Sequence, residues 1–400
     1  MYHQHDASAV MKEQKLDSIL FNLGEEHSKY YNAISPPIIQ TSNFKFDTIA
    51  EFRKAIIEED KNHIYTRGIN PTVDILRKKI AALEHAEDCL ITGSGASAIA
   101  AAVTSLVSAG DHIICVEKPY SWTYKLITQF LSRYGVTHTF VDGTDINNII
   151  AARTPATKIL FLESPNSLTY ELQDLQACGT WCRENGIISI IDNSYCSPVY
   201  QNPIPYGIDL VVHSGTKYLN GHSDVVMGAI CGSSHHISQI FHDAYMTFGT
   251  ILSPHDAWLA LRGLRTLPLR MKEINQTCNE VMEFLDGHPS VRKVIHPFHR
   301  DFPQRDLALR QMRGCGGLFT IDLNMQSKSE VSDFVHKVKR FRMAVSWGGH
   351  ESLMLPSLIF HDIEGQESSP IPWTYARFYV GLESSEYLIE DLRSALPSSS

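Results

Sequence analysis

The stretch Asp209-Leu-Val-Val-His-Ser-Gly-Thr-Lys217-Tyr-Leu-Asn-Gly-His-Ser223 decides the fold of this chain. It begins with the short apolar run 210–212, which is too brief for a helix and predicts a buried strand. Ser214, Thr216 and Lys217 follow at the end of that strand, where open α/β sheets bind their ligands. Hydroxyls suit a phosphate, and a desolvated lysine can form a Schiff base with a carbonyl. The spacing suggests a site for a small anion that carries a carbonyl, and it leaves an exposed turn open as the alternative.

Length and composition limit the class of protein. A chain of 400 residues exceeds what one hydrophobic core comfortably serves, so we expect two domains and an arm. The net charge of −9 argues against nucleic acid as a partner. No apolar run approaches the ~18 to 20 residues that span a bilayer, and no secretory signal is visible at the N-terminus. We therefore expect no membrane partner.

The eight cysteines are scattered and form no CxxC pair. Two of them, Cys115 and Cys231, lie inside predicted apolar strands, where a reduced cysteine behaves as a small hydrophobic residue. Disulfides are rare in the reducing cytosol, so this usage predicts free thiols and a cytoplasmic location.

From about residue 88 the sequence alternates predicted strands with predicted helices. The candidate strands are 89–91, 113–116, 136–141, 158–162 and 187–191. Strands separated by helices predict a mainly parallel sheet that is covered on both faces. Beyond about residue 255, strand candidates at 291–295, 317–323, 343–346 and 377–380 interleave with helices at 329–340 and 386–395. We expect an N-terminal arm at 1–60, a large domain at 61–256 and a smaller α+β domain at 257–400.

Polar residues come directly after several of the predicted strands. They are Tyr120, Glu163, Asp192 and the run from Ser214 to Lys217. The carboxyl ends of parallel strands meet at one edge of a sheet, so we expect these side chains to converge there. Gly93-Ser94-Gly95 precedes a helix, and its backbone N–H groups together with the helix dipole would attract a phosphate.

The same glycines fit the loose G-x-G-x-x-A fingerprint of a dinucleotide site. Glu117 lies about 22 residues past Gly95, so spacing alone leaves that alternative open. A dinucleotide site has no evident use for Lys217 beside Ser214 and Thr216, and we therefore favour the small carbonyl ligand.

Asp192 ends a solidly apolar strand, where a buried charge is costly unless it is paired. A structural salt bridge or a helix cap is one interpretation. The other is a partner for a protonated ring nitrogen, which keeps a pyridinium cationic and makes a cofactor an electron sink.

The stretch from Asp209 to Ser223 resembles, at every position, the signature of the Cys/Met-metabolism enzymes that depend on pyridoxal 5'-phosphate (PLP). The resemblance extends over nearly the whole chain. It implies fold type I of the PLP-dependent transferases, which is similar to aspartate aminotransferase: a large α/β domain on a mainly parallel, seven-stranded sheet and a smaller α+β C-terminal domain. It also implies an amino-acid substrate, and a homodimer as the active unit within a homotetramer.

The resemblance implies roles for individual residues. Lys217 would hold PLP and move protons with Tyr120, while Asp192 would pair with the ring nitrogen and Tyr120 would stack on the ring. Tyr65 and Arg67 match a Tyr-x-Arg segment that reaches the cofactor phosphate of a neighbouring subunit. The implied cofactor-binding residues are Tyr65, Arg67, Gly95, Ala96, Tyr120, Asp192, Ser214, Thr216 and Lys217. The implied substrate-binding residues are Ser346, Trp347 and Arg377. Without the resemblance, Tyr120 could be a core aromatic and Arg377 a solvated strand residue.

Within the family, several features are similar to bacterial-type cystathionine β-lyase. The segment from Glu163 to Glu171 lacks the Ser-Pro-x-Asn-Pro ending common in γ-acting enzymes, and Val345 stands where those enzymes often carry glutamate. Two departures are the absence of an acid around Lys125 and the presence of Asn43 in place of a small hydroxyl residue. We expect β-elimination of cystathionine or a related S-substituted cysteine to a thiol, pyruvate and ammonia. The alternatives are γ-elimination or γ-replacement on cystathionine or an O-activated homoserine, and a catalytically silent PLP-binding protein.

The histidines do not predict a metal centre. His235-His236, His296 with His299, and His3 with His5 have loose metal-ligand spacings, but no cysteine or carboxylate set accompanies them at a recognised spacing. We expect no metal.

Overall fold

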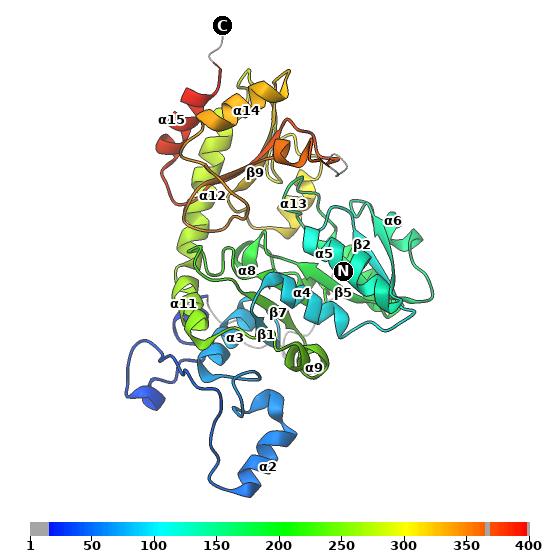
Figure 1. The fold of residues 1–400 in the computed structure, drawn as a ribbon, viewed down its shortest axis with the longest axis vertical. Helices are drawn as coiled ribbons and strands as arrows, with labels where there is room; N and C mark the ends of the chain where they lie inside the picture. Colours follow the sequence, from blue (N-terminus) through cyan, green and yellow to red (C-terminus); the bar gives the residue numbers. More distant parts are fainter. Residues whose placement is uncertain (1–15, 365–368, 398–400) are drawn as a thin grey trace, which may run out of the picture.

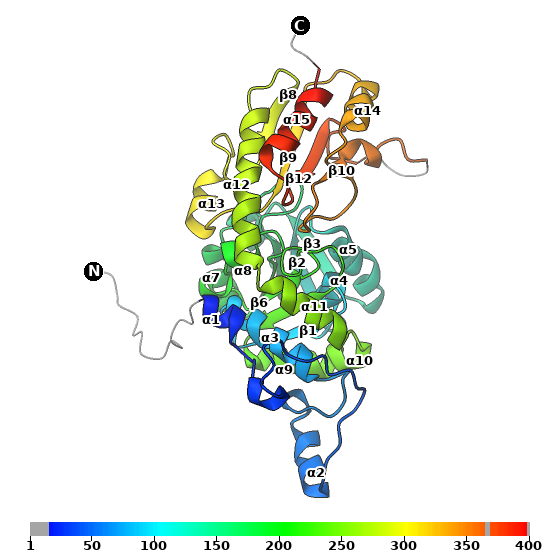
Figure 2. The ribbon, with the colours of Figure 1, turned by 90° about the vertical axis from the view of Figure 1, so that its left-hand side faces the viewer.

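The computed structural model describes residues 16–364 and 369–397. Two sheets organise this part of the chain (Figure 1). The first has seven strands in the order β1-β7-β6-β5-β4-β2-β3, and the second has five in the order β10-β11-β12-β9-β8. The second sheet lies at one end of the molecule with helices α14 and α15, and α12 runs from the first sheet to the second (Figure 2).

The first sheet is mainly parallel, as the alternation of strands and helices predicts. Its strands are β1 (Asp88–Thr92), β2 (His112–Val116), β3 (Thr137–Val141), β4 (Thr157–Glu163), β5 (Ile188–Asp192), β6 (Leu210–Ser214) and β7 (Gly228–Gly232). Strands β3, β2, β4, β5 and β6 run parallel, whereas β7 is antiparallel to both β6 and β1. The sequence analysis placed Cys231 in an apolar strand but gave that strand no bounds, because β7 has only five residues and begins and ends with glycine, which gives a weak strand signal.

Helices cover both faces of this sheet. On one face, α3 (Pro71–Leu83), α7 (Leu175–Asn185) and α11 (Pro254–Leu264) pack in one core with Ile191 and Val211. On the other face, α4 (Gly95–Thr104) and α9 (Ser234–Ile240) pack with Ile190 and Val212. Neighbouring residues of a strand point to opposite faces, so the uniformly apolar strands supply both cores.

The remaining elements around the first sheet are short. They are α5 (Ser121–Lys125), the π-helix η4 (Leu126–Phe130), the 3₁₀ helix η5 (Leu131–Tyr134), α6 (Ile146–Ala151), α8 (Ser197–Tyr200), η6 (Ile204–Tyr206), the π-helix η7 (Phe241–Tyr245) and α10 (Met246–Phe248). The single helix predicted over 122–134 is therefore a succession of α, π and 3₁₀ turns, which ends at Gly135 in the left-handed region as the sequence indicates.

The predicted arm contains helices as well as extended chain. The described elements are α1 (Leu16–Phe21), η2 (His27–Tyr30), α2 (Ile49–Ile57) and η3 (Glu59–Lys61). Helix α2 begins with a capping box between Thr48 and Glu51 and projects from the body of the molecule (Figure 2). Helix α1 is held by Lys79 of α3, whose Nζ donates to the carbonyls of Ile19 and Leu20 at 2.9 and 3.0 Å.

The second sheet forms the smaller α+β unit that the sequence predicts. Its strands are β8 (Val291–Ile295), β9 (Leu318–Leu323), β10 (Arg342–Met343), β11 (Leu353–Pro356) and β12 (Tyr375–Tyr379), and the accompanying helices are α12 (Leu267–Leu285), α13 (Arg305–Gln311), α14 (Lys328–Lys337), η8 (Ser357–Phe360) and α15 (Ser385–Ala395). The strand expected at 343–346 is shorter than predicted, and β11 was not predicted. Pro268 separates two helices, because α11 ends at Leu264 and the proline lies in the first turn of α12.

All eight cysteines are buried and unpaired. Within 16–364 and 369–397, no helix combines the length and the apolar character needed to cross a bilayer.

Candidate active site

The residues predicted to converge lie at the carboxyl edge of the first sheet. Glu163, Asp192 and Ser214 are the last residues of β4, β5 and β6, which are adjacent strands. Glu163 and Asp192 are directly paired in register, so their side chains leave the same face of the sheet. Thr216 and Lys217 follow Ser214 in the turn after β6.

Lys217 contacts the loop that follows β10. Its Nζ donates to Ser346 Oγ at 2.5 Å and lies 5.4 Å from the centroid of the Trp347 ring. Gly348 permits this approach, because a Cβ at that position would lie 2.7 Å from the Lys217 Cα and its φ is +90°. Burial and the Arg377 charge, opposed by the Asp192 charge, lower the pKa of Lys217 to about 8. The amine is therefore partly neutral near pH 7 to 8 and can accept a proton.

Asp192 is a buried acid that is not neutralised by a salt bridge. Its Oδ1 accepts a hydrogen bond from the Ser194 backbone N–H at 2.9 Å, and no ion pair with it occurs in the described residues. Burial raises the pKa of Asp192, whereas the hydrogen bonds from Ser194 and the charges of His213 and Lys217 lower it. A buried carboxylate without a cation of its own fits a partner that brings a positive charge.

Glu163 lies beside Asp192 and connects it to the loop that carries Tyr120. Its Oε2 accepts from the Tyr120 backbone N–H at 2.6 Å. Burial and the neighbouring Asp192 charge raise the pKa of Glu163 to about 8. Two carboxylates at adjacent strand ends do not both ionise easily, so Glu163 holds a proton at neutral pH.

Tyr120 is exposed at the rim. It caps the N-terminus of α5, and 43% of the residue is accessible. This exposure rules out the interpretation of Tyr120 as a core aromatic. Its pKa is raised by burial of the hydroxyl and by the charges of Asp192 and Glu163.

The loop of Gly93, Ser94 and Gly95, which is predicted to bind a phosphate, lies next to Ser214. A Cβ on Gly95 would lie 2.7 Å from the Ser214 Cβ, so the first turn of α4 packs directly against the end of β6. Ser94 and Ser97 cap this helix reciprocally, while the N–H groups of Gly95 and Ala96 have no acceptor within the described chain. Thr216 Oγ1 donates to the Met227 carbonyl and accepts from the Met227 N–H, so part of its capacity is already used.

Arg377 is a buried guanidinium without a carboxylate partner. It lies on β12 with 8% exposure, and it donates to the carbonyls of Ser167 and Ser346 at 3.1 and 3.3 Å. Among the described residues, no acid forms an ion pair with Arg377. The interpretation of Arg377 as a solvated strand residue is therefore wrong, and the side chain fits an incoming carboxylate.

Tyr65 and Arg67 contact each other but do not join this group. The Arg67 guanidinium lies 5.6 Å from the Tyr65 ring centroid, and Tyr65 forms an isolated bridge with Asn43. Within the described chain, no hydrogen bond connects Tyr65 or Arg67 to Lys217, Ser214 or Gly95. Their predicted role toward a neighbouring subunit stays a prediction.

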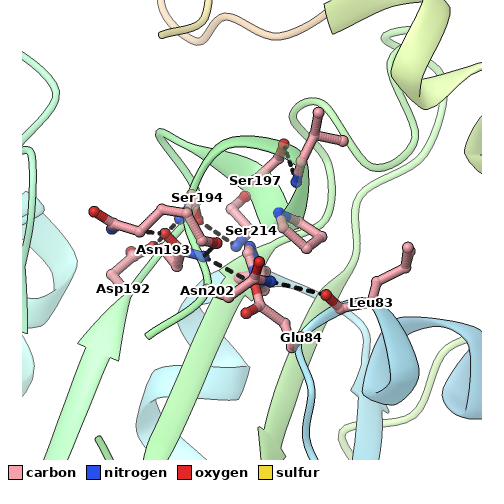
Figure 3. A network of polar contacts seen from close by, with 12 residues as sticks. Leu83, Glu84, Asp192, Asn193, Ser194, Ser197, Asn202 and Ser214 are labelled. Carbon is pink, nitrogen blue, oxygen red and sulfur yellow. Dashed lines mark hydrogen bonds and ion pairs between the residues drawn. The ribbon is translucent and has the colours of Figure 1, made fainter. Parts of the chain in front are cut away.

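The sequence analysis missed the residues behind this edge. Ser194 donates its backbone N–H to Asp192, and its Oγ accepts from the Ser214 backbone N–H at 2.6 Å (Figure 3). The Asp-Asn-Ser order of residues 192–194 was the available signal for Ser194. Glu84 contacts Asn193 and His213, but a glutamate at the end of a helix carries no signal of its own.

The arrangement has the groups that PLP requires. Gly95 and Ala96 offer free N–H groups beside Ser214, Asp192 offers a buried carboxylate, and Lys217 offers an amine with a lowered pKa. A phosphate, a protonated ring nitrogen and an aldehyde would each meet a complementary group. This fold and this edge thus define an enzyme site for an anionic carbonyl cofactor.

Comparison with known proteins names that enzyme class. The chain belongs to the Cys/Met metabolism PLP-dependent enzyme family, whose model matches residues 17–397. An L-methionine gamma-lyase of Treponema denticola is 36% identical over 399 residues, covering 96% of this chain and 99% of that protein. Cystathionine beta-lyase MetC of Bacillus subtilis is 34% identical over 368 residues, covering 91% of this chain and 92% of that protein.

A solved structure is also similar. The crystal structure of metB from Corynebacterium glutamicum superposes with a TM-score of 0.88 at 30% identity, covering 98% of this chain and 99% of that chain. The predictions of the family, of fold type I and of PLP as cofactor are confirmed. The chain is an enzyme of the PLP-dependent carbon–sulfur lyase family, and its relatives include both β- and γ-acting enzymes.

Proposed function

We propose that this enzyme catalyses β-elimination on cystathionine or a related S-substituted cysteine, releasing a thiol, pyruvate and ammonia. The observation that carries the proposal is the double contact of Ser346. Its Oγ accepts from Lys217 Nζ and its carbonyl accepts from Arg377 Nη2. One residue thereby places a proton-accepting amine next to a cation suited to an α-carboxylate. This is the arrangement that chemistry at the Cα of an amino acid requires.

Each residue of the site has a separate role in the proposed reaction. Arg377 and Ser346 bind the α-carboxylate, and Trp347 packs beside them. PLP, when bound, supplies an electron sink for the charge that develops at Cα. Lys217 Nζ accepts the Cα proton, for which a pKa of about 8 is well matched. Asp192 stabilises the positive charge of the ring nitrogen, while Tyr65 and Arg67 of a second subunit, Gly95, Ala96, Ser214 and Thr216 bind the phosphate.

The leaving thiolate needs a proton. Lys217, protonated after the first step, and Tyr120 at the rim are the two candidate donors. The raised pKa of Tyr120 keeps its hydroxyl protonated at neutral pH and available as a donor. Water then completes the conversion of the remaining three-carbon fragment into pyruvate and ammonia.

The preference for β chemistry rests on Val345. Its exposure is 71%, and it stands next to Ser346 where γ-acting relatives often carry a glutamate. An apolar side chain there offers no base for proton removal one carbon further from the carboxylate. The second candidate, γ-elimination or γ-replacement, is supported by the similarity to an L-methionine gamma-lyase. A catalytically silent protein is disfavoured by the intact contacts of Lys217, Asp192 and Arg377.

The assembly and the domain boundaries are part of the proposal. We expect a homodimer as the active unit, paired into a homotetramer, because Tyr65 and Arg67 do not join the site of their own chain. We also expect the division into 1–60, 61–256 and 257–400 to correspond to an N-terminal arm, a PLP-binding large domain and a small C-terminal domain.

The test is an absorbance spectrum of the purified protein with PLP, followed by addition of L-cystathionine and separate assays of pyruvate and 2-oxobutyrate. We expect a band near the edge of the visible range that shifts on addition, with pyruvate as the product. Formation of 2-oxobutyrate would replace the β assignment with γ chemistry. Lys217→Ala is the control, and full turnover in that variant would refute the proposed role of Lys217.

A further inference from the structure

We propose that Glu84, which lies behind the candidate active site, is a positioning residue that sets the alignment of Asp192 with Ser214. The inference rests on the proposed cofactor contacts of those two residues. Glu84 follows α3 as its C-cap, and none of its surface is exposed. Neither the reaction described above nor the phosphate-binding loop uses it.

Glu84 joins the ends of two strands through a single oxygen. Its Oε1 accepts from Asn193 Nδ2 at 2.8 Å and from His213 Nε2 at 2.5 Å. Asn193 is the residue directly after Asp192, and His213 is the residue directly before Ser214. A displacement of the Glu84 carboxylate is therefore passed on to both site residues through one peptide unit each.

The Asn193 side chain is fixed from two sides. Besides its bond to Glu84, Asn193 Nδ2 donates to the Gln201 carbonyl at 2.9 Å, and Asn193 Oδ1 accepts from Gln201 Nε2 at 3.0 Å. These contacts leave the amide no alternative orientation, so Glu84 meets a rigid partner on β5.

A second connection lies on the cofactor side. Ser194 bonds to Asp192 through its backbone N–H and to the Ser214 backbone N–H through its Oγ. Besides the backbone hydrogen bond from the Asn193 N–H to the Val212 carbonyl, side chains thus join the ends of β5 and β6 twice, once through Ser194 at the site and once through Glu84 behind it. The two side-chain connections lie on opposite sides of this backbone hydrogen bond in the chain, at Ser194 and at His213, so together they restrict rotation of one strand end against the other.

The chemistry of Glu84 goes beyond what packing requires. Its second oxygen, Oε2, is buried and has no hydrogen-bond partner. Leaving a buried oxygen unpaired is unfavourable, and a neutral residue would avoid a buried carboxylate. The carboxylate does strengthen both of its hydrogen bonds, because charge-assisted hydrogen bonds are about twice as strong as neutral ones. The unpaired Oε2 costs stability, whereas the two strong hydrogen bonds of Oε1 hold the ends of β5 and β6 rigidly at the edge of the site.

The test compares PLP affinity with protein stability. Full-length protein is freed of cofactor and titrated with PLP, and the thermal midpoint of the cofactor-free protein is measured in parallel. Glu84→Gln keeps the size and one acceptor but removes the charge, and we expect its Kd for PLP to rise by about tenfold. Asn202→Ala is the matched control, because Asn202 also donates to the end of α3, at 2.9 Å to the Leu83 carbonyl, but contacts neither Asn193 nor His213. Its Kd should stay unchanged even if its thermal midpoint falls.

A double-mutant cycle tests whether Glu84 acts through His213. We expect His213→Leu to raise the Kd by a similar factor, and the double variant to show little further loss, because both changes break the same connection. At saturating PLP, kcat should fall while KM stays constant, since Ser346 and Arg377 are untouched. Should Glu84→Gln not fold, His213→Leu carries the same expectation.

Three results would overturn the inference: an unchanged Kd in Glu84→Gln, an equal rise in Asn202→Ala, or fully additive losses in the double variant. Asp192→Ala separates this inference from the function on which it rests. If Asp192→Ala leaves PLP affinity intact, the proposed contact of Asp192 with the cofactor, on which the inference rests, fails. If Asp192→Ala weakens binding and Glu84→Gln does not, only the role of Glu84 fails.

Discussion

Replacing Glu163 by glutamine should make the protein more stable at alkaline pH and remove one source of its pH dependence. The carboxyl of Glu163 is buried beside Asp192, and its pKa rises from the ordinary 4.5 to about 8. In the unfolded chain the same carboxyl ionises near its ordinary value. Between these two values the folded state binds the extra proton, so wild-type stability falls as the pH rises.

The size of the stability gain in Glu163→Gln follows from the raised pKa of Glu163. Each pKa unit corresponds to about 1.4 kcal/mol, so the displacement from 4.5 to about 8 gives an upper limit of about 5 kcal/mol at pH 9. Glutamine resembles the protonated acid and still accepts from the Tyr120 N–H. Glu163→Gln should therefore match the wild type near pH 4 and exceed its stability progressively up to pH 8.

The assay is denaturant unfolding of the cofactor-free protein at several pH values from 4 to 9. Glu171→Gln is the control, and we expect it to change the free energy of unfolding in the opposite direction. Burial opposes ionisation of Glu171, but hydrogen bonds from Lys118 and Thr169 prevail and lower its pKa. That variant should lose stability above the pKa of Glu171 rather than gain it. Wild-type and Glu163→Gln curves that run parallel from pH 5 to 9 would refute the reasoning.

Three further predictions test other parts of the structure. Arg377→Lys should raise KM about 10- to 100-fold because the planar, two-pronged guanidinium is lost, with PLP absorbance unchanged as the control; an unchanged KM would contradict the role in carboxylate binding. Gly348→Ala should reduce PLP occupancy, measured by absorbance, because its Cβ would lie 2.7 Å from the Lys217 Cα, whereas Gly110→Ala, with a φ of +93° and no atom within 4 Å, should affect stability alone. Equal occupancy in the two glycine variants would argue against the close approach. Lys79→Met should lower the free energy of unfolding by about 3 kcal/mol, because Nζ forms a buried 3.1 Å ion pair with Glu25, and limited proteolysis should then cut the chain before α2. Unaltered unfolding and digestion would show that Lys79 does not anchor this segment.

Much of the fold followed from local pattern. The uniformly apolar runs that became β2, β4, β5 and β6 are buried on both faces, and such runs between helical segments specify a parallel sheet. The run from Ser214 to Lys217 indicated the ligand-binding edge, because it follows a predicted strand of that sheet at its carboxyl end. The bounds of β7 could not be predicted, because the strand begins and ends with glycines that its neighbours require: a Cβ on Gly228 would lie 2.2 Å from the Ser94 carbonyl oxygen.

The sequence by itself determined which chemical groups are present and along which edge of the sheet most of them lie, because strand direction fixes where residues after a strand emerge. Only the tertiary structure brought Ser346, in the loop after β10, to Lys217 across 129 residues, and the Arg377 guanidinium of β12 to the Ser346 carbonyl across 31 residues. It also decided that the pKa of Glu163 is raised and that of Lys217 is lowered. Both pKa values depend on burial and on neighbouring charges, which arise when distant segments pack together and which no local pattern encodes.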